Sequence, residues 1–121
     1  MTLKIKHGEL WLANLNPTRG TEAGKHRPVL IIQNQALLDI QHPSTLIIPL
    51  TTNLINDAEP LRIRIKAHEK LEKDSDLLID QIRAIDNKRL LEGPLLCCSK
   101  VFMEHVYEAI CEVIGVEITL L

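Results

Sequence analysis

The sequence predicts a mainly β fold with one late helix, in which a strongly bent antiparallel sheet closes into a small barrel. Short apolar or alternating segments, bounded by turn residues, recur through most of the chain. Only the segment after Ser99 has a clear helical period. The chain has 121 residues, 45 % of them hydrophobic, which suits a single domain over residues 1–121.

Three strands are expected in the first half of the chain. The first alternates around Trp11, and the other two are continuous apolar runs rich in β-branched residues, as in buried strands. The first connection is long and contains Pro17, Gly20 and Gly24, and long loops in small domains are often functional. The expected strands are 8–15, 27–33 and 45–50, with connections at 16–26 and 34–44.

The second half is predicted to add three more short strands. The first of them alternates Arg62 and Arg64 with apolar residues, a pattern typical of a half-exposed strand. Its neighbours in the chain are a polar loop and a charged segment. The expected strands are 61–65, 77–82 and 93–98, with a loop at 53–60, a charged segment at 67–76 and a short turn or helix at 84–91.

The clearest single element is a helix that begins after Ser99, a favourable N-cap, and ends at Gly115, a favourable C-cap. Glutamates at i,i+4 spacing indicate a solvated face; a catalytic carboxylate ladder is the less favoured interpretation. The apolar face comprises Phe102, Val106, Ala109, Ile110 and Val113, and the acidic face Glu104, Glu108 and Glu112.

Composition excludes several classes of function. The formal charge is −2, so a basic surface that wraps many phosphates is not expected. One Trp, one Tyr and one Phe are too few for an aromatic platform that stacks bases. Residues Cys97, Cys98 and Cys111 are expected to be buried and reduced, and no cysteine or histidine spacing predicts a metal site or cofactor. Without a signal peptide or an apolar run of membrane length, a cytoplasmic protein is expected.

Three polar segments could carry chemistry. Arg27 stands where the long loop meets a strand, and Pro28 restricts it to an extended conformation. A surface ion pair with Glu22 is an equally open interpretation. The other two segments are Thr51-Thr52-Asn53 at a strand end, which could equally be turn and capping residues, and Asp80-Gln81-Ile82-Arg83 within an apolar run.

Together these segments would supply a guanidinium, hydroxyls, a carboxylate and an amide. The planar guanidinium matches two phosphate oxygens and can stabilise the charge of a pentacoordinate phosphorane. RNA carries its own nucleophile, the 2′-hydroxyl. The set therefore suits cleavage of RNA phosphodiesters without a metal.

The stretch GELWLANLNPTRGTEAGKHRPVLIIQN resembles the N-terminal signature of the MazF/PemK family of toxin endoribonucleases. IIPLTTN is similar to the second family motif and DLLIDQIRAIDNKRL to the third, so the resemblance covers nearly the whole chain. It implies an SH3-like β-barrel with a C-terminal helix and a homodimer neutralised by a cognate antitoxin. It also implies metal-independent cleavage of single-stranded mRNA to a 2′,3′-cyclic phosphate and a 5′-hydroxyl.

By this resemblance Arg27 matches the catalytic arginine of the family and Thr51 its catalytic threonine or serine. Further residues are expected to contact RNA because they lie in or beside the family motifs. The set is Thr21, Glu22, Thr52, Asn53, Asp80, Gln81 and Arg83.

The chain departs from the family pattern at several positions. Asn14 replaces the usual acidic residue, and Ala23 replaces the usual glutamine. Thr21 and Leu78 stand where PemK relatives have a histidine and an arginine, which favours the Arg27/Thr51 pair over a histidine acid. Two alternatives stay open: a toxin like CcdB, which shares this fold and binds DNA gyrase, and an inactive member that retains antitoxin binding.

Overall fold

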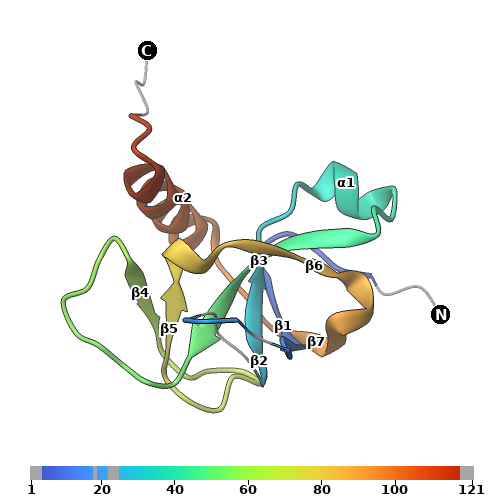
Figure 1. The fold of residues 1–121 in the computed structure, drawn as a ribbon, viewed down its shortest axis with the longest axis horizontal. Helices are drawn as coiled ribbons and strands as arrows, with labels where there is room; N and C mark the ends of the chain where they lie inside the picture. The colour runs from blue at the N-terminus through green and yellow to red at the C-terminus, as the bar shows by residue number, and fades with distance from the viewer. Residues whose placement is uncertain (1–3, 18, 22–24, 118–121) are drawn as a thin grey trace.

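The computed structural model describes residues 4–17, 19–21 and 25–117. Figure 1 shows the course of the chain through the elements it contains. The strands are β1 (Glu9–Asn14), β2 (His26–Ile31), β3 (Ser44–Thr51), β4 (Arg62–Ile65), β5 (Ser75–Leu78), β6 (Arg83–Asp86) and β7 (Leu90–Cys97). The helices are α1 (Gln35–Asp39) and α2 (Lys100–Ile114), with short 3-10 turns η1 (Ile79–Gln81) and η2 (Asn87–Arg89).

Among the described residues, seven strands form an antiparallel sheet, of which six follow the order β4-β5-β3-β2-β1-β7 and the seventh, β6, pairs with β3 off this path. Strand β3 pairs with β2 along one edge. Its other edge pairs with β6 over 44–47 and with β5 at Leu50 and Thr51. Consequently β5 and β6 are two pieces of one bent edge, separated by η1.

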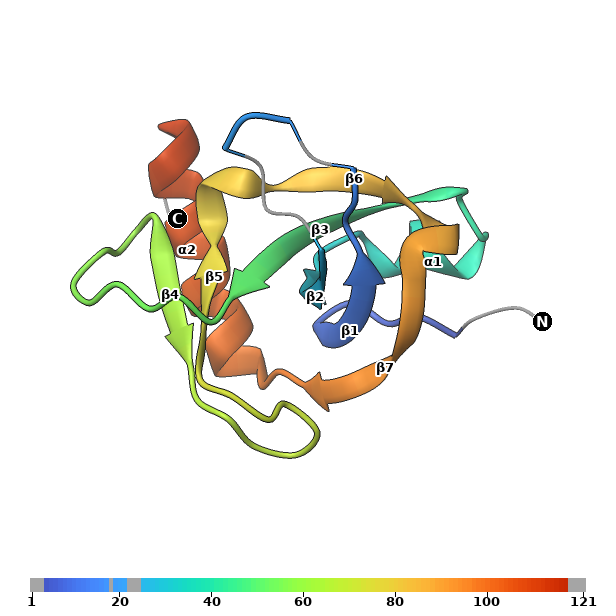
Figure 2. The same cartoon turned by 60° about the horizontal axis from the view of Figure 1, so that its bottom comes forward.

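The pairing order leaves the sheet open between its end strands, β4 and β7. The strands nevertheless curve round a common interior (Figure 2). On the open side the Lys70 N–H, in the β4–β5 connection, donates to the Leu95 carbonyl of β7 at 3.0 Å. The fold is therefore mainly antiparallel β with a C-terminal helix, and this strand pairing does not establish closure into a barrel.

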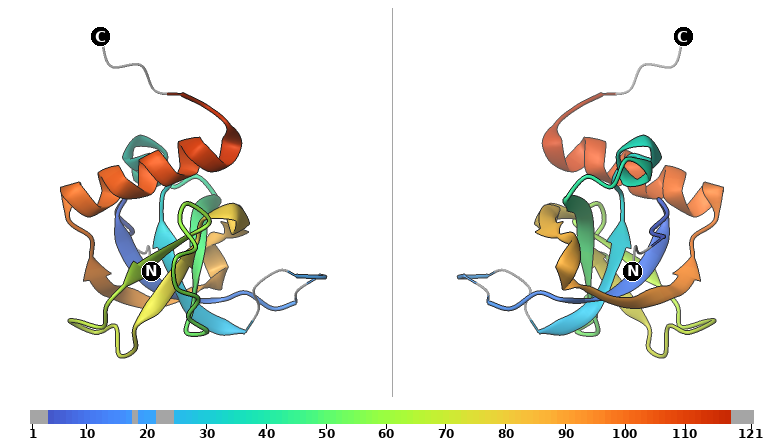
Figure 3. Two further views of the ribbon diagram at one scale, coloured as in Figure 1. Left: turned by 90° about the vertical axis from the view of Figure 1, so that its left-hand side faces the viewer. Right: turned by 90° about the vertical axis from the view of Figure 1, so that its right-hand side faces the viewer.

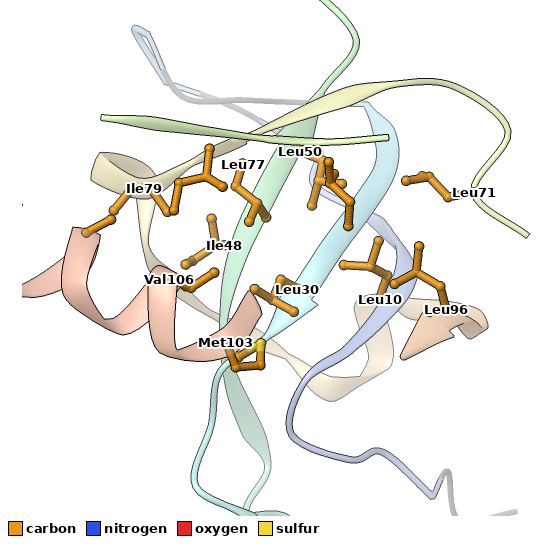
Figure 4. Packing of buried hydrophobic residues seen from close by; sticks show 13 residues of the cluster. Leu10, Leu30, Ile48, Leu50, Leu71, Leu77, Ile79, Leu96, Met103 and Val106 are labelled. Atoms are coloured by element: carbon orange, nitrogen blue, oxygen red, sulfur yellow. The ribbon is translucent and has the colours of Figure 1, made fainter. Parts of the chain in front are cut away.

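Both faces of the sheet carry apolar residues, because alternate side chains point to opposite sides. Helix α2 lies across one of them (Figure 3), which we call the helix-covered face. There Met103 and Val106 pack on Leu10, Leu30 and Ile48 (Figure 4). The other face is called the open-site face, and its buried cluster comprises Ile5, Trp11, Ala13, Leu15, Val29, Ile31, Ile47, Ile85 and Leu90.

Helix α2 confirms the prediction from its sequence. The Ser99 hydroxyl accepts a hydrogen bond from the Phe102 N–H at 3.1 Å, and Gly115 ends the helix in the left-handed region at φ 76°. Met103, Val106 and Ala109 are buried, and Phe102, Ile110 and Val113 pack partly against the same cluster. Glu104, Glu108 and Glu112 are exposed, so the acidic stripe is a solvated face.

The first four expected strands are confirmed as β1 to β4. The single strand expected at 77–82 is wrong, since β5 begins at Ser75, ends at Leu78 and is followed by η1. The turn or helix expected at 84–91 is confirmed only by η2, and its extent is wrong, because the residues before η2 belong to β6 and those after it to β7. Both errors arise because these residues pair with β3, which lies far away in the sequence.

Two smaller expectations also need correction. The connection at 34–44 contains α1, where the Asn34 side chain accepts from the Ala36 N–H at 2.9 Å. The cysteines are free, but Cys97 is exposed and the other two are only partly buried, so full burial is wrong. Burial raises the pKa of the Cys98 thiol to about 12, which disfavours the reactive thiolate.

Candidate functional site

The two ends of the long β1–β2 connection are tied together at its base. The Leu15 N–H donates to the Lys25 carbonyl at 2.9 Å, and the Lys25 N–H donates to Asn16 Oδ1 at 2.8 Å. Asn14 Oδ1 accepts from the Asn16 N–H at 3.0 Å. The Arg89 guanidinium donates to the carbonyls of Asn14 and Asn16. This base fixes the point at which the chain enters β2.

Arg27 lies near the start of β2 and is partly buried. Its Nη1 donates to the Leu50 carbonyl on β3 at 3.0 Å. Burial lowers the pKa of Arg27 from its ordinary value. A guanidinium is still charged at neutral pH. Because partial burial withdraws this charge from bulk water, its attraction to an anion is stronger than it would be in water.

The strand register brings Arg27 towards Thr51. In the β2–β3 pairing, Val29 stands opposite Pro49 and Ile31 opposite Ile47. Continued by two residues, the same antiparallel register sets Arg27 opposite Thr51, and opposed residues project from the same face. The Leu50 carbonyl that binds Arg27 belongs to the peptide unit directly before Thr51.

The Thr51-Thr52-Asn53 segment is divided between the two faces. Thr51 is partly buried, and its Oγ1 accepts from the Asn53 N–H at 3.1 Å, so it does make the local turn contact considered from sequence. Thr52 instead lines a groove with Leu12 and Pro28, which alternate with the residues of the open-site face. Thr51 and Thr52 therefore do not belong to one side-chain surface.

The third sequence segment meets the first through Gln81. Its Nε2 donates to the Thr21 carbonyl at 3.3 Å, which joins η1 to the long loop. Arg83 is partly buried in β6, opposite Ile47. Asp80 is exposed in η1, so it does not lie within a strand as the expected span 77–82 implied. Glu22 lies outside the described residues.

Sequence reasoning missed Asp76, which stands opposite Thr51 on β5 and is 1 % exposed. Asp76 Oδ1 accepts from Arg64 Nε at 2.6 Å, and Oδ2 accepts from Arg62 Nη1 at 3.2 Å and the Ile55 N–H at 3.0 Å. Burial alone would raise the pKa of Asp76, but the hydrogen bonds from Arg64, Ile55 and Arg62 lower it overall. The alternation of Arg62 and Arg64 in the sequence was the available signal.

Two general features of the described residues bear on function. They contain no cluster of three or more His, Cys, Asp or Glu side chains arranged to hold a metal ion. None of the helices described is both long and apolar enough to cross a membrane.

A sequence family described as PemK-like, MazF-like toxins of type II toxin–antitoxin systems matches residues 6–114. The chain belongs to the MazF/PemK toxin family. The family identity agrees with the three sequence motifs and with the order of strands and helix described above.

Solved structures of MazF toxins have the same fold. A MazF from Deinococcus radiodurans aligns with a TM-score of 0.77 and 20 % identity, over 93 % of this chain and 98 % of that one. The Mycobacterium tuberculosis toxin MazF-mt6 aligns with a TM-score of 0.74 and 19 % identity, over 91 % of this chain and 99 % of that one. A mycobacterial endoribonuclease in complex with its cognate antitoxin aligns with a TM-score of 0.70 and 16 % identity, over 96 % of this chain and 98 % of that one.

Proposed function

We propose that this MazF/PemK toxin is a metal-independent endoribonuclease that cleaves single-stranded RNA at a site built on Arg27 and Thr51. One observation carries the proposal. Arg27 Nη1 lies 3.0 Å from the carbonyl of Leu50, the residue that precedes Thr51. A guanidinium and a hydroxyl from neighbouring strands can therefore act on the same phosphate group.

In the proposed reaction the substrate's 2′-oxygen attacks the adjacent phosphorus and the bond from phosphorus to the 5′-oxygen breaks. The proton lost by the 2′-hydroxyl is balanced by one gained at the leaving oxygen, which gives a 2′,3′-cyclic phosphate and a 5′-hydroxyl. Arg27 stabilises the negative charge of the phosphorane and donates towards the leaving oxygen. Thr51 holds the scissile phosphate through its hydroxyl.

The RNA on either side of that phosphate would lie along the same edge of the molecule. Gln81 and Thr21 are joined by a hydrogen bond at this edge, and Arg83 follows on β6. We assign base or backbone contacts to these three residues, to the exposed Asp80 and Asn53, and to Glu22 of the same loop. Thr52 is left out of this surface, because it lines the groove on the other side of the sheet.

We further propose that the toxin acts in the cytoplasm as a homodimer and is neutralised by a cognate antitoxin. The mycobacterial endoribonuclease of similar fold was solved with its antitoxin, and a Deinococcus radiodurans MazF with MazE, which supports a protein partner here. Co-expression with its cognate antitoxin should restore growth that the toxin alone arrests.

The decisive experiment incubates the purified protein with end-labelled single-stranded RNA in EDTA. The wild type should cleave the RNA, and Arg27→Ala should lose about a hundredfold or more in rate because charge stabilisation in the transition state is removed. Lys100→Ala is the matched control, since Lys100 is an exposed cation on α2, which covers the other face of the sheet.

Product chemistry tests the mechanism separately. Mass spectrometry should find the 2′,3′-cyclic phosphate, and an RNA with a single 2′-deoxyribose at the scissile position should resist cleavage. Full activity in a folded Arg27→Ala protein would refute the site, and cleavage of the deoxy-substituted RNA would refute the nucleophile. A wild type that leaves RNA intact but captures DNA gyrase would favour the CcdB-like alternative.

A further inference from the structure

The cluster formed by Arg62, Arg64 and Asp76 is more than a surface ion pair. Asp76 is 1 % exposed, whereas the arginine side chains retain 19 % and 33 % of their exposure. A buried carboxylate is costly unless it is fully paired, and here three donors satisfy it. Such a group holds its donors in defined places.

Those donors lead directly to the β3–β4 loop that follows Thr51. Besides Asp76, Arg62 Nη1 donates to the Asn53 carbonyl at 2.8 Å. The Asn53 N–H in turn donates to Thr51 Oγ1 at 3.1 Å. A continuous chain of hydrogen bonds therefore runs from the buried Asp76 through Arg62 and Asn53 to the Thr51 hydroxyl.

The strand register gives the chain of bonds a rigid base. Thr51 stands opposite Asp76, and Asp76 opposite Arg64, across β3, β5 and β4. The neighbouring row, Leu50 opposite Leu77, is buried in the core of the helix-covered face. Cross-strand partners share a face, so Thr51 and the charged cluster lie on the side away from α2.

The bond to Thr51 also decides what its hydroxyl can do. A hydroxyl has one O–H donor and two acceptor lone pairs. Because Oγ1 accepts the Asn53 N–H, one lone pair is fixed towards the loop. The O–H proton is then directed elsewhere, where it can donate to a phosphate oxygen.

The cavity beside the cluster does not favour a phosphate as the ligand of these arginines. Its wall carries the carboxylates of Asp57, Glu59 and Asp76 against only two guanidinium groups, those of Arg62 and Arg64. The excess negative charge would repel a phosphate. The arginines are thus better explained by their bonds to the protein's own loop.

We propose that Asp76 and Arg62 are positioning residues for Thr51, with Asp76 orienting Arg62, Arg62 holding the Asn53 carbonyl, and the Asn53 N–H setting the Thr51 hydroxyl. This inference rests on the proposed endoribonuclease function. It assigns the two residues a role without any contact to substrate.

A double-mutant cycle on RNA cleavage tests the inference. In the wild-type background, where Thr51 is present, Arg62→Gln should lower the single-turnover cleavage rate about tenfold and leave the affinity for RNA unchanged within about twofold. In a Thr51→Ala background the same substitution should change the rate by less than about twofold, because its target is gone. Equal losses in both backgrounds would overturn the proposal.

Arg64→Gln is the matched variant from the same cluster. Within the described residues, the Arg64 guanidinium donates to Asp76 Oδ1 at 2.6 Å and to Asn56 Oδ1 at 3.0 Å. This change should lower the melting temperature about as much as Arg62→Gln but reduce the cleavage rate by less than about threefold. Equal rate losses for the two arginines would refute the route through Asn53.

A measurement independent of activity separates the inference from the proposed function. Amide hydrogen exchange at Asn53 should accelerate about tenfold in Arg62→Gln and in Asp76→Asn, and stay unchanged in Arg64→Gln. Unchanged exchange in Arg62→Gln would overturn the positioning role. If the wild type cleaves no RNA, the proposed function fails, yet this exchange measurement still tests the chain of bonds.

Discussion

At the scale of single residues, the proposed site depends on how a charge and a hydroxyl are held by backbone groups. Arg27 is oriented by the Leu50 carbonyl, and Thr51 by the Asn53 N–H. Neither partner is a side chain: the turn contact of Thr51 could be anticipated from its neighbours in the sequence, whereas the contact between Arg27 and the Leu50 carbonyl could not. Their common feature is strand β3, whose end supplies Leu50 and Thr51.

The first residue-scale prediction concerns the shape of the cation. Arg27→Lys keeps the positive charge but loses the planar fork that matches two phosphate oxygens. We expect the protein to stay folded and the RNA cleavage rate to fall about a hundredfold. Single-turnover kinetics with circular dichroism as the folding control would measure this, and near-wild-type rates would show that charge alone suffices.

The second residue-scale prediction concerns acid stability. The pKa of Asp76 is lowered in the folded state from its ordinary 3.8. Its ionised form therefore stabilises the fold above that value, and the stabilisation is lost as the pH falls through the lower, folded-state pKa. Asp76→Asn, which cannot ionise, should cost about 2 kcal/mol near neutral pH.

Urea unfolding at several pH values checks this prediction. The difference between wild type and Asp76→Asn should stay constant from neutral pH down to about pH 5 and shrink below about pH 4. A difference that is independent of pH down to about pH 3 would contradict a role for the ionised carboxylate.

At the scale of elements, β1 and β7 approach each other closely where Gly93 meets Trp11. A Cβ at Gly93 would lie 2.3 Å from Trp11 Cδ2, which is too close for any real contact. Trp11 is buried, and its Nε1 donates to Glu9 at 3.1 Å, so the ring has little room to move. This explains why β7 has a glycine at this position.

Gly93→Ala should therefore destabilise the protein by about 3 kcal/mol through overpacking against Trp11. Glu92→Ala is the control, because Glu92 is exposed on the same strand and its loss should cost less than about 0.5 kcal/mol. Chemical denaturation of both variants makes the comparison. Equal stabilities would show that β7 can shift away from the indole ring.

At the scale of the whole molecule, two apolar clusters share one sheet. Helix α2 packs on the first, and Trp11, the only tryptophan of the chain, lies in the second. Strands β1, β2 and β3 contribute to both clusters. We therefore expect the two faces to unfold together as a single domain.

Two optical probes test this expectation. Tryptophan fluorescence reports the Trp11 cluster, and far-ultraviolet circular dichroism reports α2, so their urea midpoints should coincide. Separate midpoints would indicate two units. A midpoint that rises with protein concentration would support the proposed homodimer, because association stabilises the folded state by mass action.

The elements that could be predicted from the sequence are those whose signals are local. Continuous apolar runs predicted β2 and β3, and the Ser99 and Gly115 caps with a helical period predicted α2, because these patterns need only neighbouring residues. The family motifs likewise singled out Arg27 and Thr51. Their order in the chain, however, says nothing of how far apart their side chains lie.

The pairing of strand edges could not be predicted and is known from the three-dimensional fold. Strand β6 was not predicted because its partner, β3, lies far away in the sequence. Asp80 is exposed in η1, between β5 and β6. The sequence assigned Asp76 to a charged segment, whereas the strand register places it between Thr51 and Arg64. The physical reason is that cross-strand register is a long-range property, whereas propensity, periodicity and capping are local.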